Sequence, residues 1–375
     1  MEKLHIHEKQ NAPFFSIIIP VYNVDLNYFD KCMDSILRQN FNDFEVIIVD
    51  DGSQSNCAKI CDDYAKKDLR INVVHQKNLG VSAARNNGMK VARADWIMFM
   101  DSDDWLENDA FDKLYSILKS NPCDILLFDH IKEYSSGKKV RKGTGLTNNK
   151  LYCTTDVNTK EMLYRRAMGT PNLGGINQST IYYSWDKVYR REFIQKNNLK
   201  FPEGLPKSED KVFILECFEK VNLLYYTNMA LYHYRINGDS ATYKYSQYVD
   251  DERRDLSVYL EKIAHRMDSE LAKLKGDSSY SLVYSDYMRF IFGIISNILF
   301  SKYYHKDYKG SHAKRRAEVK EFLKSDPFKT AIDFCKYTEL GGEAKAKKFM
   351  LTHGLTSLFC GLVEVKRKIS KQNNQ

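Results

Sequence analysis

Short apolar runs alternate with helical stretches over the first 130 residues, and this alternation constrains the fold more than any other feature of the sequence. The runs are rich in β-branched residues, as is typical of strands that are buried on both faces of a parallel sheet. They cover residues 15–20, 44–49, 71–74, 96–100 and 124–128. Alternation at this pitch predicts an α/β fold, in which a mostly parallel sheet carries helices on both faces.

Polar clusters follow three of the predicted strands. Tyr22 and Asn23 follow the first strand, Asp50 and Asp51 follow the second, and the sequence Asp-Ser-Asp-Asp at 101–104 follows the fourth. In sheets of this type, ligands bind beyond the carboxyl ends of the strands. Packing alone does not explain polar clusters at three equivalent positions, so the pattern favours a nucleotide or phosphate site.

The cluster at 101–104 places three carboxylates within four positions, directly after an apolar strand. Such a cluster is electrostatically unfavourable unless a cation neutralises it. Mg²⁺ and Mn²⁺ prefer carboxylate oxygens and leave other coordination positions to substrate phosphates. Two interpretations are open from these residues alone: a metal–phosphate site, or an acidic turn that caps the following helix.

The character of the sequence changes near residue 243. Strand patterns end there, and helical spacing dominates over residues 246–275, 279–302, 313–324 and about 344–370. We therefore expect two domains, residues 1–243 and residues 244–375. The C-terminal helical region could associate with a membrane or with a partner, including a second copy of the chain.

Charge supports an anionic partner for that C-terminal region. Residues 1–240 hold 32 basic and 32 acidic side chains, whereas residues 241–375 hold 25 and 17, so the whole net charge of +8 lies there. Basic side chains flank the apolar positions of the last predicted helix: Lys345, Lys347, Lys348, Lys366, Arg367, Lys368 and Lys371. This is the pattern of a basic amphipathic helix at a membrane interface. A helix that packs on the protein's own core with solvated basic ends fits equally well.

Cysteine spacing and hydropathy predict a cytoplasmic location. The eight cysteines are scattered without a C-x-x-C pair, which favours reduced thiols over a metal site or a disulfide framework. The N-terminus lacks the apolar core of a signal peptide. No apolar run reaches the ~18 residues that a membrane-spanning helix needs. We expect a cytoplasmic protein, either free or peripheral at the inner face of the cytoplasmic membrane.

Four motifs, in this order and at close spacing, resemble those of the family 2 inverting nucleotide-sugar glycosyltransferases. They are Ser16–Asn23, Val49–Ser53, Asn78–Asn86 and Met100–Asp104. The resemblance covers residues 14–130 strongly and residues 180–242 more loosely. It implies the GT-A fold, with a Rossmann-like mostly parallel sheet, and a UDP-sugar as donor substrate.

The resemblance also implies roles for residues that hold the donor. Either Asp50 or Asp51 would bind the uracil and ribose, Tyr22 would line the base pocket, and Pro20 would shape the strand end. Ser102 would contact the donor beside the aspartates. Arg85 would reach the diphosphate or hold the aspartate cluster, unless it only forms a structural ion pair.

The metal would be Mn²⁺ or Mg²⁺, held by Asp101 and Asp103, and it would stabilise the departing nucleotide as a Lewis acid. His233 and Arg235 would complete the metal–diphosphate shell, although a lone strand histidine is more often structural. Asp104 would cap the next helix or orient the two ligands.

Inversion requires a base that takes the proton of the attacking hydroxyl. Asp210 matches the Glu-Asp motif of the family and is the candidate base, and Glu209 would position the acceptor. The competing interpretation is that Ser208 or Asp210 merely caps the following helix.

Departures from the wider family narrow the expected function. The Gln-x-x-Arg-Trp motif and the transmembrane helices of processive polysaccharide synthases are absent from this sequence, which favours a single transfer per encounter. The basic helical region suits an acceptor saccharide that is linked to lipid, as in the assembly of capsule, exopolysaccharide or lipopolysaccharide. The loop at 170–175 is a predicted lid.

The sequence disfavours three other classes of protein. A sugar-phosphate nucleotidyltransferase would need a glycine-rich basic loop after the first strand, where this chain has Pro20 to Asn23. A catalytically inactive nucleotide-sugar or glycan-binding module would not need Asp101, Asp103 and Asp210. A nucleic-acid binder is disfavoured because the basic region lacks the pattern of a known module.

Overall fold

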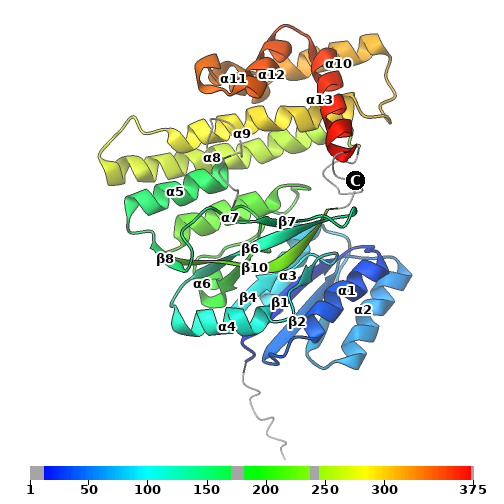
Figure 1. The fold of residues 1–375 in the computed structure, drawn as a ribbon, viewed down its shortest axis with the longest axis vertical. Helices are drawn as coiled ribbons and strands as arrows, with labels where there is room; N and C mark the ends of the chain where they lie inside the picture. The colour runs from blue at the N-terminus through cyan, green and yellow to red at the C-terminus, as the bar shows by residue number, and fades with distance from the viewer. Residues whose placement is uncertain (1–11, 170–180, 237–244, 373–375) are drawn as a thin grey trace, which may run out of the picture.

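The structure is a computed structural model that describes residues 12–169, 181–236 and 245–372. A sheet flanked by helices occupies the lower half of the view in Figure 1. Helices from the C-terminal part of the chain stack above it in the same view.

One mixed sheet runs through the described residues. Its strands are β1 (Phe15–Val21), β2 (Phe44–Asp50), β3 (Ile71–His75), β4 (Trp96–Phe99), β5 (Trp105–Leu106), β6 (Ile125–Tyr134), β7 (Lys139–Lys142), β8 (Lys150–Cys153), β9 (Lys187–Arg190) and β10 (Leu223–Ile236). The order across the sheet is β3-β2-β1-β4-β9-β6-β10-β5, with β7 paired to β6 and β8 paired to β10. β3, β2, β1 and β4 are parallel, as are β6 and β10. The predicted α/β fold with a mostly parallel sheet is confirmed.

Two antiparallel pairings bring distant parts of the chain to the carboxyl end of β4. β9 runs antiparallel to β4 with Val188 opposite Met98, so the residues just before β9 lie beside the end of β4. β5 pairs with β10, with His233 opposite Trp105. The segment after His233 therefore lies beside the 101–104 cluster.

Helices cover both faces of the sheet and form the C-terminal part of the chain. They are α1 (Leu26–Leu37), α2 (Ser55–Lys67), α3 (Val81–Val91), α4 (Ala110–Ser120), α5 (Val157–Met168), α6 (Arg191–Lys196), α7 (Glu209–Lys220), α8 (Val249–Lys275), α9 (Leu282–Ile298), α10 (His312–Lys324), α11 (Phe328–Phe334), α12 (Gly342–Thr352) and α13 (Thr356–Gln372). α9 continues into a π-helical turn at Leu299–Tyr303, and a short 3₁₀ turn follows α11 at Tyr337–Glu339.

The sheet separates two hydrophobic cores, because successive side chains of a strand point to opposite faces. Ile17 and Ile19 of β1 belong to the core that α1, α2 and α4 cover. Ile18 belongs to the core on the α3 side. Gly88 allows α3 to lie directly on β1, since a Cβ at this position would stand 2.4 Å from Ile18 Cγ2.

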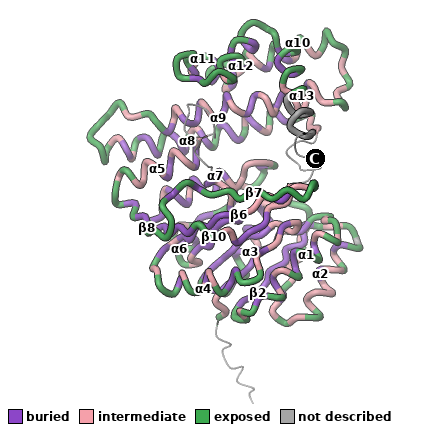
Figure 2. The backbone as a smooth tube through the Cα atoms, in the orientation of Figure 1, coloured by how far each residue is buried: buried purple, intermediate pink, exposed green. Residues whose placement is uncertain are grey.

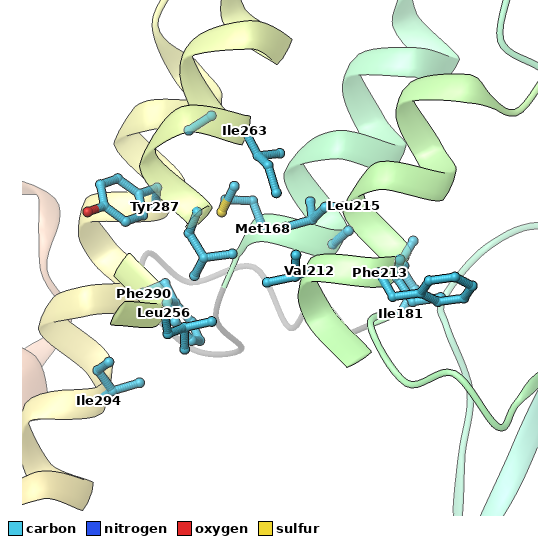
Figure 3. Close-up of a cluster of buried hydrophobic side chains, with 14 of the residues drawn as sticks. Met168, Ile181, Val212, Phe213, Leu215, Leu256, Ile263, Tyr287, Phe290 and Ile294 are labelled. Atoms are coloured by element: carbon cyan, nitrogen blue, oxygen red, sulfur yellow. The ribbon is translucent and has the colours of Figure 1, made fainter. Parts of the chain in front are cut away.

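The core on the α3 side extends into the C-terminal helices. It includes buried side chains from the sheet, from α5 and α7, and from every helix between α8 and α13. Figure 2 shows buried positions along α8 and α9 as well as in the sheet. In Figure 3, Met168, Val212, Leu256 and Tyr287 meet from α5, α7, α8 and α9. β10, which ends at Ile236, is the last described strand, and the helices from Val249 onward share a core with the sheet. The division at 243/244 stays a prediction, because residues 237–244 lie outside the described residues.

The end of the chain differs from the single helix predicted over about 344–370. Gly354 has a φ of +70°, and this left-handed conformation ends α12 before α13 begins. The N–H of Leu355 donates to the carbonyl of Met350 at 2.8 Å, as is typical of a helix ended by glycine.

The predicted basic flank of this last helix is also partly wrong. Lys347 and Lys348 are buried, and their ammonium groups donate to the carbonyl oxygens of Phe292 and Cys335. Burial lowers the pKa of Lys347 to about 7. These two lysines therefore pack α12 onto the protein and are not available to an anionic surface.

Two further observations concern compartment and membrane topology. All eight cysteines are free thiols. Among the described residues, none of the helices combines the length and the apolar character that crossing a bilayer requires.

Candidate active site at the strand ends

Asp104 anchors the loop that follows β4. Its buried carboxylate accepts the Tyr232 hydroxyl at 2.7 Å and the backbone N–H of Arg235 at 2.8 Å. The same hydroxyl accepts the backbone N–H of Asp101 at 3.1 Å. The next helix begins only at Ala110, and none of the hydrogen bonds of Asp104 reaches it. Of its two predicted roles, the geometry supports orientation of the loop.

Asp101 and Asp103 line one cavity at the end of β4. Burial, reinforced by the charge of Asp101, raises the pKa of Asp103 to about 6. A divalent cation between the two carboxylates would relieve this repulsion, so the pair fits Mg²⁺ or Mn²⁺. In the part of the chain that the structure describes, no three His, Cys, Asp or Glu side chains form a closed metal site.

His233 is not placed to be a metal ligand, contrary to the prediction. Its Nδ1 lies 2.8 Å from a carboxylate oxygen of Glu133, and its Nε2 lies 2.9 Å from one of Glu107. The ring is stacked on Trp105 with a centroid distance of 5.1 Å. Both nitrogens are therefore engaged, and the imidazole joins β10 to β6 and to the segment after β5.

Arg85 joins two acidic groups that are more than 100 residues apart in the sequence. One terminal nitrogen donates to Asp101 at 2.9 Å, and the other donates to Glu209 at 2.9 Å and to Asp210 at 2.8 Å. Burial alone lowers the pKa of Arg85, but the attraction of Asp210, Asp101 and Glu209 outweighs it and the pKa is raised. Of the roles predicted for Arg85, holding the aspartate cluster matches this geometry.

Glu209 and Asp210 open α7 on the opposite side of Arg85. Ser208 precedes them with a φ of +69°, and its side chain does not cap the helix. The Ser184 hydroxyl donates to Asp210 at 2.9 Å. Burial raises the pKa of Asp210 although Arg85 and Ser184 oppose it, and burial likewise raises the pKa of Glu209.

The first cavity has a volume of about 790 Å³ and lies beyond the carboxyl ends of β1, β2 and β4. Pro20, Tyr22, Ser102 and the aspartate pair line it together with residues 78–82 and 204–206. The Tyr22 side chain is 53% exposed. Of the predicted donor residues at these strand ends, Pro20, Tyr22, Asp51 and Ser102 line this cavity, and Asp50 does not.

The structure distinguishes Asp51 from Asp50. Asp51 lines the cavity, and its oxygens accept the backbone N–H groups of Leu79 and Gly80 at 2.8 and 2.9 Å. The Asp50 carboxylate instead faces β3, where it lies 2.8 Å from His75 Nδ1. Gly52 permits this tight arrangement: its φ is +72°, and a Cβ there would stand 2.8 Å from the backbone nitrogen of Asn78.

The N-terminus of α3 is a part of the site that the residue-by-residue predictions missed. Gly80 precedes the helix with a φ of +90°, and Val81 and Ser82 line the first cavity. The buried Ser82 hydroxyl has no hydrogen-bond partner among the described residues. Free N–H groups at a helix N-terminus attract phosphate. Gly80, directly before a helical pattern, is the sequence feature from which this part of the site could have been predicted.

Arg235 lies between this cavity and a second one. Its Nε donates to the backbone carbonyl of Asp103 at 2.8 Å, and its guanidinium covers the Tyr28 ring at 3.8 Å. One terminal nitrogen, Nη2, has no partner among the described residues.

The second cavity has a volume of about 660 Å³ and adjoins the first, since Val81, Asp101 and Pro206 line both. Arg85, Glu209 and Asp210 also line it. Aromatic rings form another part of its wall: Trp185 is stacked with Tyr183 at 4.6 Å and with Tyr234 at 5.1 Å. The predicted lid at 170–175 lies outside the described residues.

Comparisons with known proteins agree with this architecture. Residues 16–194 match the model of glycosyl transferase family 2. The chain is similar to the uncharacterized glycosyltransferase EpsJ of Bacillus subtilis, with 35% identity over 231 residues that make up 61% of this chain and 63% of EpsJ. It is similar to the putative glycosyltransferase EpsH of the same organism, with 31% identity over 63% of this chain and 64% of EpsH. The chain thus matches slightly less than two thirds of the length of these relatives.

Among solved structures, a fragment of Staphylococcus aureus TarS covering residues 1–349, in complex with UDP-GlcNAc, has a similar fold. The TM-score is 0.58 with 19% sequence identity, over 95% of this chain and 92% of that fragment. The match extends across nearly the whole chain, beyond the region that the family model covers.

Proposed function

We propose that the chain, whose residues 16–194 match the model of glycosyl transferase family 2 and which has the GT-A fold, is an inverting, non-processive transferase of that family. It moves a sugar from a UDP-sugar to a hydroxyl of a saccharide acceptor. One observation carries the proposal: Arg85 bonds both to Asp101, at the first cavity, and to Asp210, at the second. A donor and an acceptor would meet where the two cavities adjoin.

The first cavity fits the nucleotide-sugar donor. Asp51 and Tyr22 would contact the uridine, and the N-terminus of α3 with the Ser82 hydroxyl would bind the diphosphate. Asp101 and Asp103 would hold the cation, which when bound offsets charge on the leaving nucleotide. Arg235, which lines the second cavity and donates to the backbone carbonyl of Asp103, adds a cationic group whose Nη2 has no partner among the described residues.

The second cavity fits the acceptor. The acceptor oxygen would attack the anomeric carbon on the face opposite the diphosphate, and the bond from that carbon to the diphosphate would break. Asp210 would take the hydroxyl proton, and its raised pKa makes it a stronger base than an exposed aspartate. Glu209, held by the same nitrogen of Arg85, would position the acceptor.

Release of UDP tests this function directly. We expect the purified chain to release UDP from one of a panel of UDP-sugars when Mn²⁺ or Mg²⁺ is present, and EDTA should abolish the release. Protons compete with the cation at Asp103, so the release should decline as the pH falls below about 6 and excess cation should restore it. Donor binding without release, under every condition and with every acceptor extract, would favour a nucleotide-sugar-binding module instead.

A membrane-facing role for the C-terminal helices is part of the proposal, because the acceptor is expected to be lipid-linked. Apolar side chains on α12, on α13 and at Leu355 between the two helices divide between the core and the surface. Met350 and Phe359 join the core, whereas Leu355, Leu358 and Leu362 are 40 to 55% exposed. An exposed row of leucines on a helix can enter the lipid interface.

Leu358→Ser combined with Leu362→Ser should weaken the sedimentation of the protein with anionic vesicles at least about tenfold, because two half-exposed leucines lose their transfer into lipid. Leu69→Ser is the matched control, since Leu69 is fully exposed in the loop before β3. If the original protein, the double leucine variant and the Leu69 variant sediment equally, the proposed membrane-facing role of the C-terminal helices is wrong.

A further inference from the structure

Besides Arg85 and Arg235, four cationic side chains line the second cavity, and they come from four different parts of the chain. Lys132 lies on β6, Lys207 precedes α7, Lys211 lies in α7 and Arg253 lies in α8. The carboxylates of the same wall, Asp101, Glu209 and Asp210, are all bound by Arg85. Within the described residues, none of these three carboxylates forms an ion pair with the four cations.

Of the four, Arg253 combines deep burial with a hydrogen-bond donor that is unpaired among the described residues. Its side chain is 94% buried, since only 6% is exposed. One terminal nitrogen donates to the Ser208 hydroxyl at 2.9 Å, and Nε has no partner in the part of the chain that the structure describes. No carboxylate of the described residues lies within ion-pair distance of this guanidinium. An arginine in this state retains donors for an anionic ligand.

The three lysines are also poorly neutralised by the described residues. Lys211 is almost completely buried and donates to the carbonyl of Ala167 at 2.9 Å. Lys132 has only ring contacts, 5.9 and 5.7 Å from the centroids of Tyr183 and Tyr234. Lys207 has a single long ion pair, 3.9 Å to Glu252.

Burial is the main influence on all four groups, and it lowers the pKa of each. For Lys211 the pKa falls to about 7. Holding several cations in one partly dehydrated wall is unfavourable unless a ligand supplies negative charge. The aromatic stack of Tyr183, Trp185 and Tyr234 forms part of the same wall, so the anion would sit beside a surface suited to a sugar ring.

We propose that the acceptor saccharide carries a phosphate group, and that Lys132, Lys207 and Arg253 bind this phosphate in the second cavity. A phosphate offers several acceptor oxygens and more than one negative charge, which matches two ammonium groups and a guanidinium better than a single carboxylate does. The inference rests on the proposed function, because it assigns a chemical class to the acceptor of that reaction. The phosphate is either part of a phosphodiester polymer or part of the diphosphate that links a saccharide to a lipid.

Binding of matched probes tests the inference without an identified acceptor. The full chain is first saturated with UDP and Mg²⁺, so that the donor cavity is blocked. Glucose 1-phosphate and glucose are then titrated by calorimetry. We expect glucose 1-phosphate to bind at least about tenfold more tightly, and this difference should shrink as NaCl is raised. Equal binding of the two probes overturns the inference.

Substitutions in the second cavity test which side chains bind the phosphate group. Lys132→Gln and Arg253→Gln should each reduce the preference for glucose 1-phosphate about tenfold, whereas Lys59→Gln and Arg316→Gln, exposed on α2 and α10, should not. Lys132 makes no ion pair within the described residues, so its variant remains informative if the Arg253 variant fails to fold. UDP affinity reports whether each variant is folded. A preference that survives both cavity variants overturns the assignment.

Transfer assays separate the two sources of phosphate. Radiolabelled sugar from the active UDP-sugar is offered to a soluble poly(glycerol phosphate) and to a polyprenyl-diphosphate saccharide in vesicles. Labelling of either acceptor, with an uncharged analogue remaining unlabelled, supports the inference and identifies the source. Labelling of uncharged acceptors alone overturns it while leaving the glycosyltransferase function intact. Absence of UDP release from every donor would instead count against the proposed function itself.

Discussion

Replacing Asp210 by asparagine is expected to lower the rate of sugar transfer by about 10² to 10⁴-fold, the usual contribution of a general base. Asparagine keeps the size of the side chain and can still accept the Ser184 hydroxyl, which lies 2.9 Å from the carboxylate. Arg85 retains Asp101 and Glu209 as partners. UDP affinity should therefore stay within about twofold of the original, because the donor cavity is unchanged.

Steady-state rates of UDP release with an active donor and acceptor, together with UDP titration, check this prediction. Asp112→Asn, an exposed substitution of the same kind on α4, should change neither quantity. Glu209→Gln should reduce the rate less than Asp210→Asn does, since Glu209 is assigned to positioning. If Glu209→Gln abolished transfer while Asp210→Asn spared it, the base would be Glu209.

The part of the site that the sequence predicts well is set by the sheet. Pro20 lies at the end of one buried parallel strand, and Asp51 and Asp101 follow two others, so their meeting at one edge follows from the alternation of strands and helices. The choice between Asp50 and Asp51 needs the register of β2 and β3. Because that register pairs Asp50 with His75, Asp50 faces β3 and leaves Asp51 at the cavity.

The parts of the site that the sequence does not predict depend on contacts between distant segments of the chain. Patterns in a single sequence do not encode such contacts. His233 has the character of a metal ligand by residue type, but Glu133 and Glu107 occupy both of its nitrogens. Lys347 and Lys348 belong to a basic amphipathic pattern, but the ends of their side chains reach carbonyl oxygens inside the helical stack. In each case the partner lies on an element whose position depends on tertiary packing.

Arg85 is the residue whose replacement should affect both stability and activity most. Arg85→Gln removes a buried guanidinium and leaves the half-buried carboxylates of Asp101, Glu209 and Asp210 together without a cation. Removal of one partner from a buried ion pair typically costs about 3–5 kcal/mol. The remaining carboxylates would have raised pKa values, so their ionisation should destabilise the folded state as the pH rises above about 4, the pKa range of unfolded Asp and Glu. We therefore expect the loss of unfolding free energy to be larger at pH 8 than at pH 5.

Urea unfolding of the variant and of the original protein at both pH values measures this loss. Arg38→Gln is the matched control, because both side chains of its ion pair with Asp34 are exposed, by 72% and 54%, and the pair should contribute less than about 1 kcal/mol. Arg85→Lys tests whether the two terminal nitrogens of the guanidinium are needed. An ammonium group keeps the positive charge, but it cannot reproduce the three hydrogen bonds that these two nitrogens make. We therefore expect the unfolding free energy to be higher than in Arg85→Gln, while the transfer rate stays low. If the Arg85→Gln protein were stable and active, the ion pairs of Arg85 would not be needed to position Asp101, Glu209 and Asp210. The proposed role of Arg85 in joining the two cavities would then be wrong.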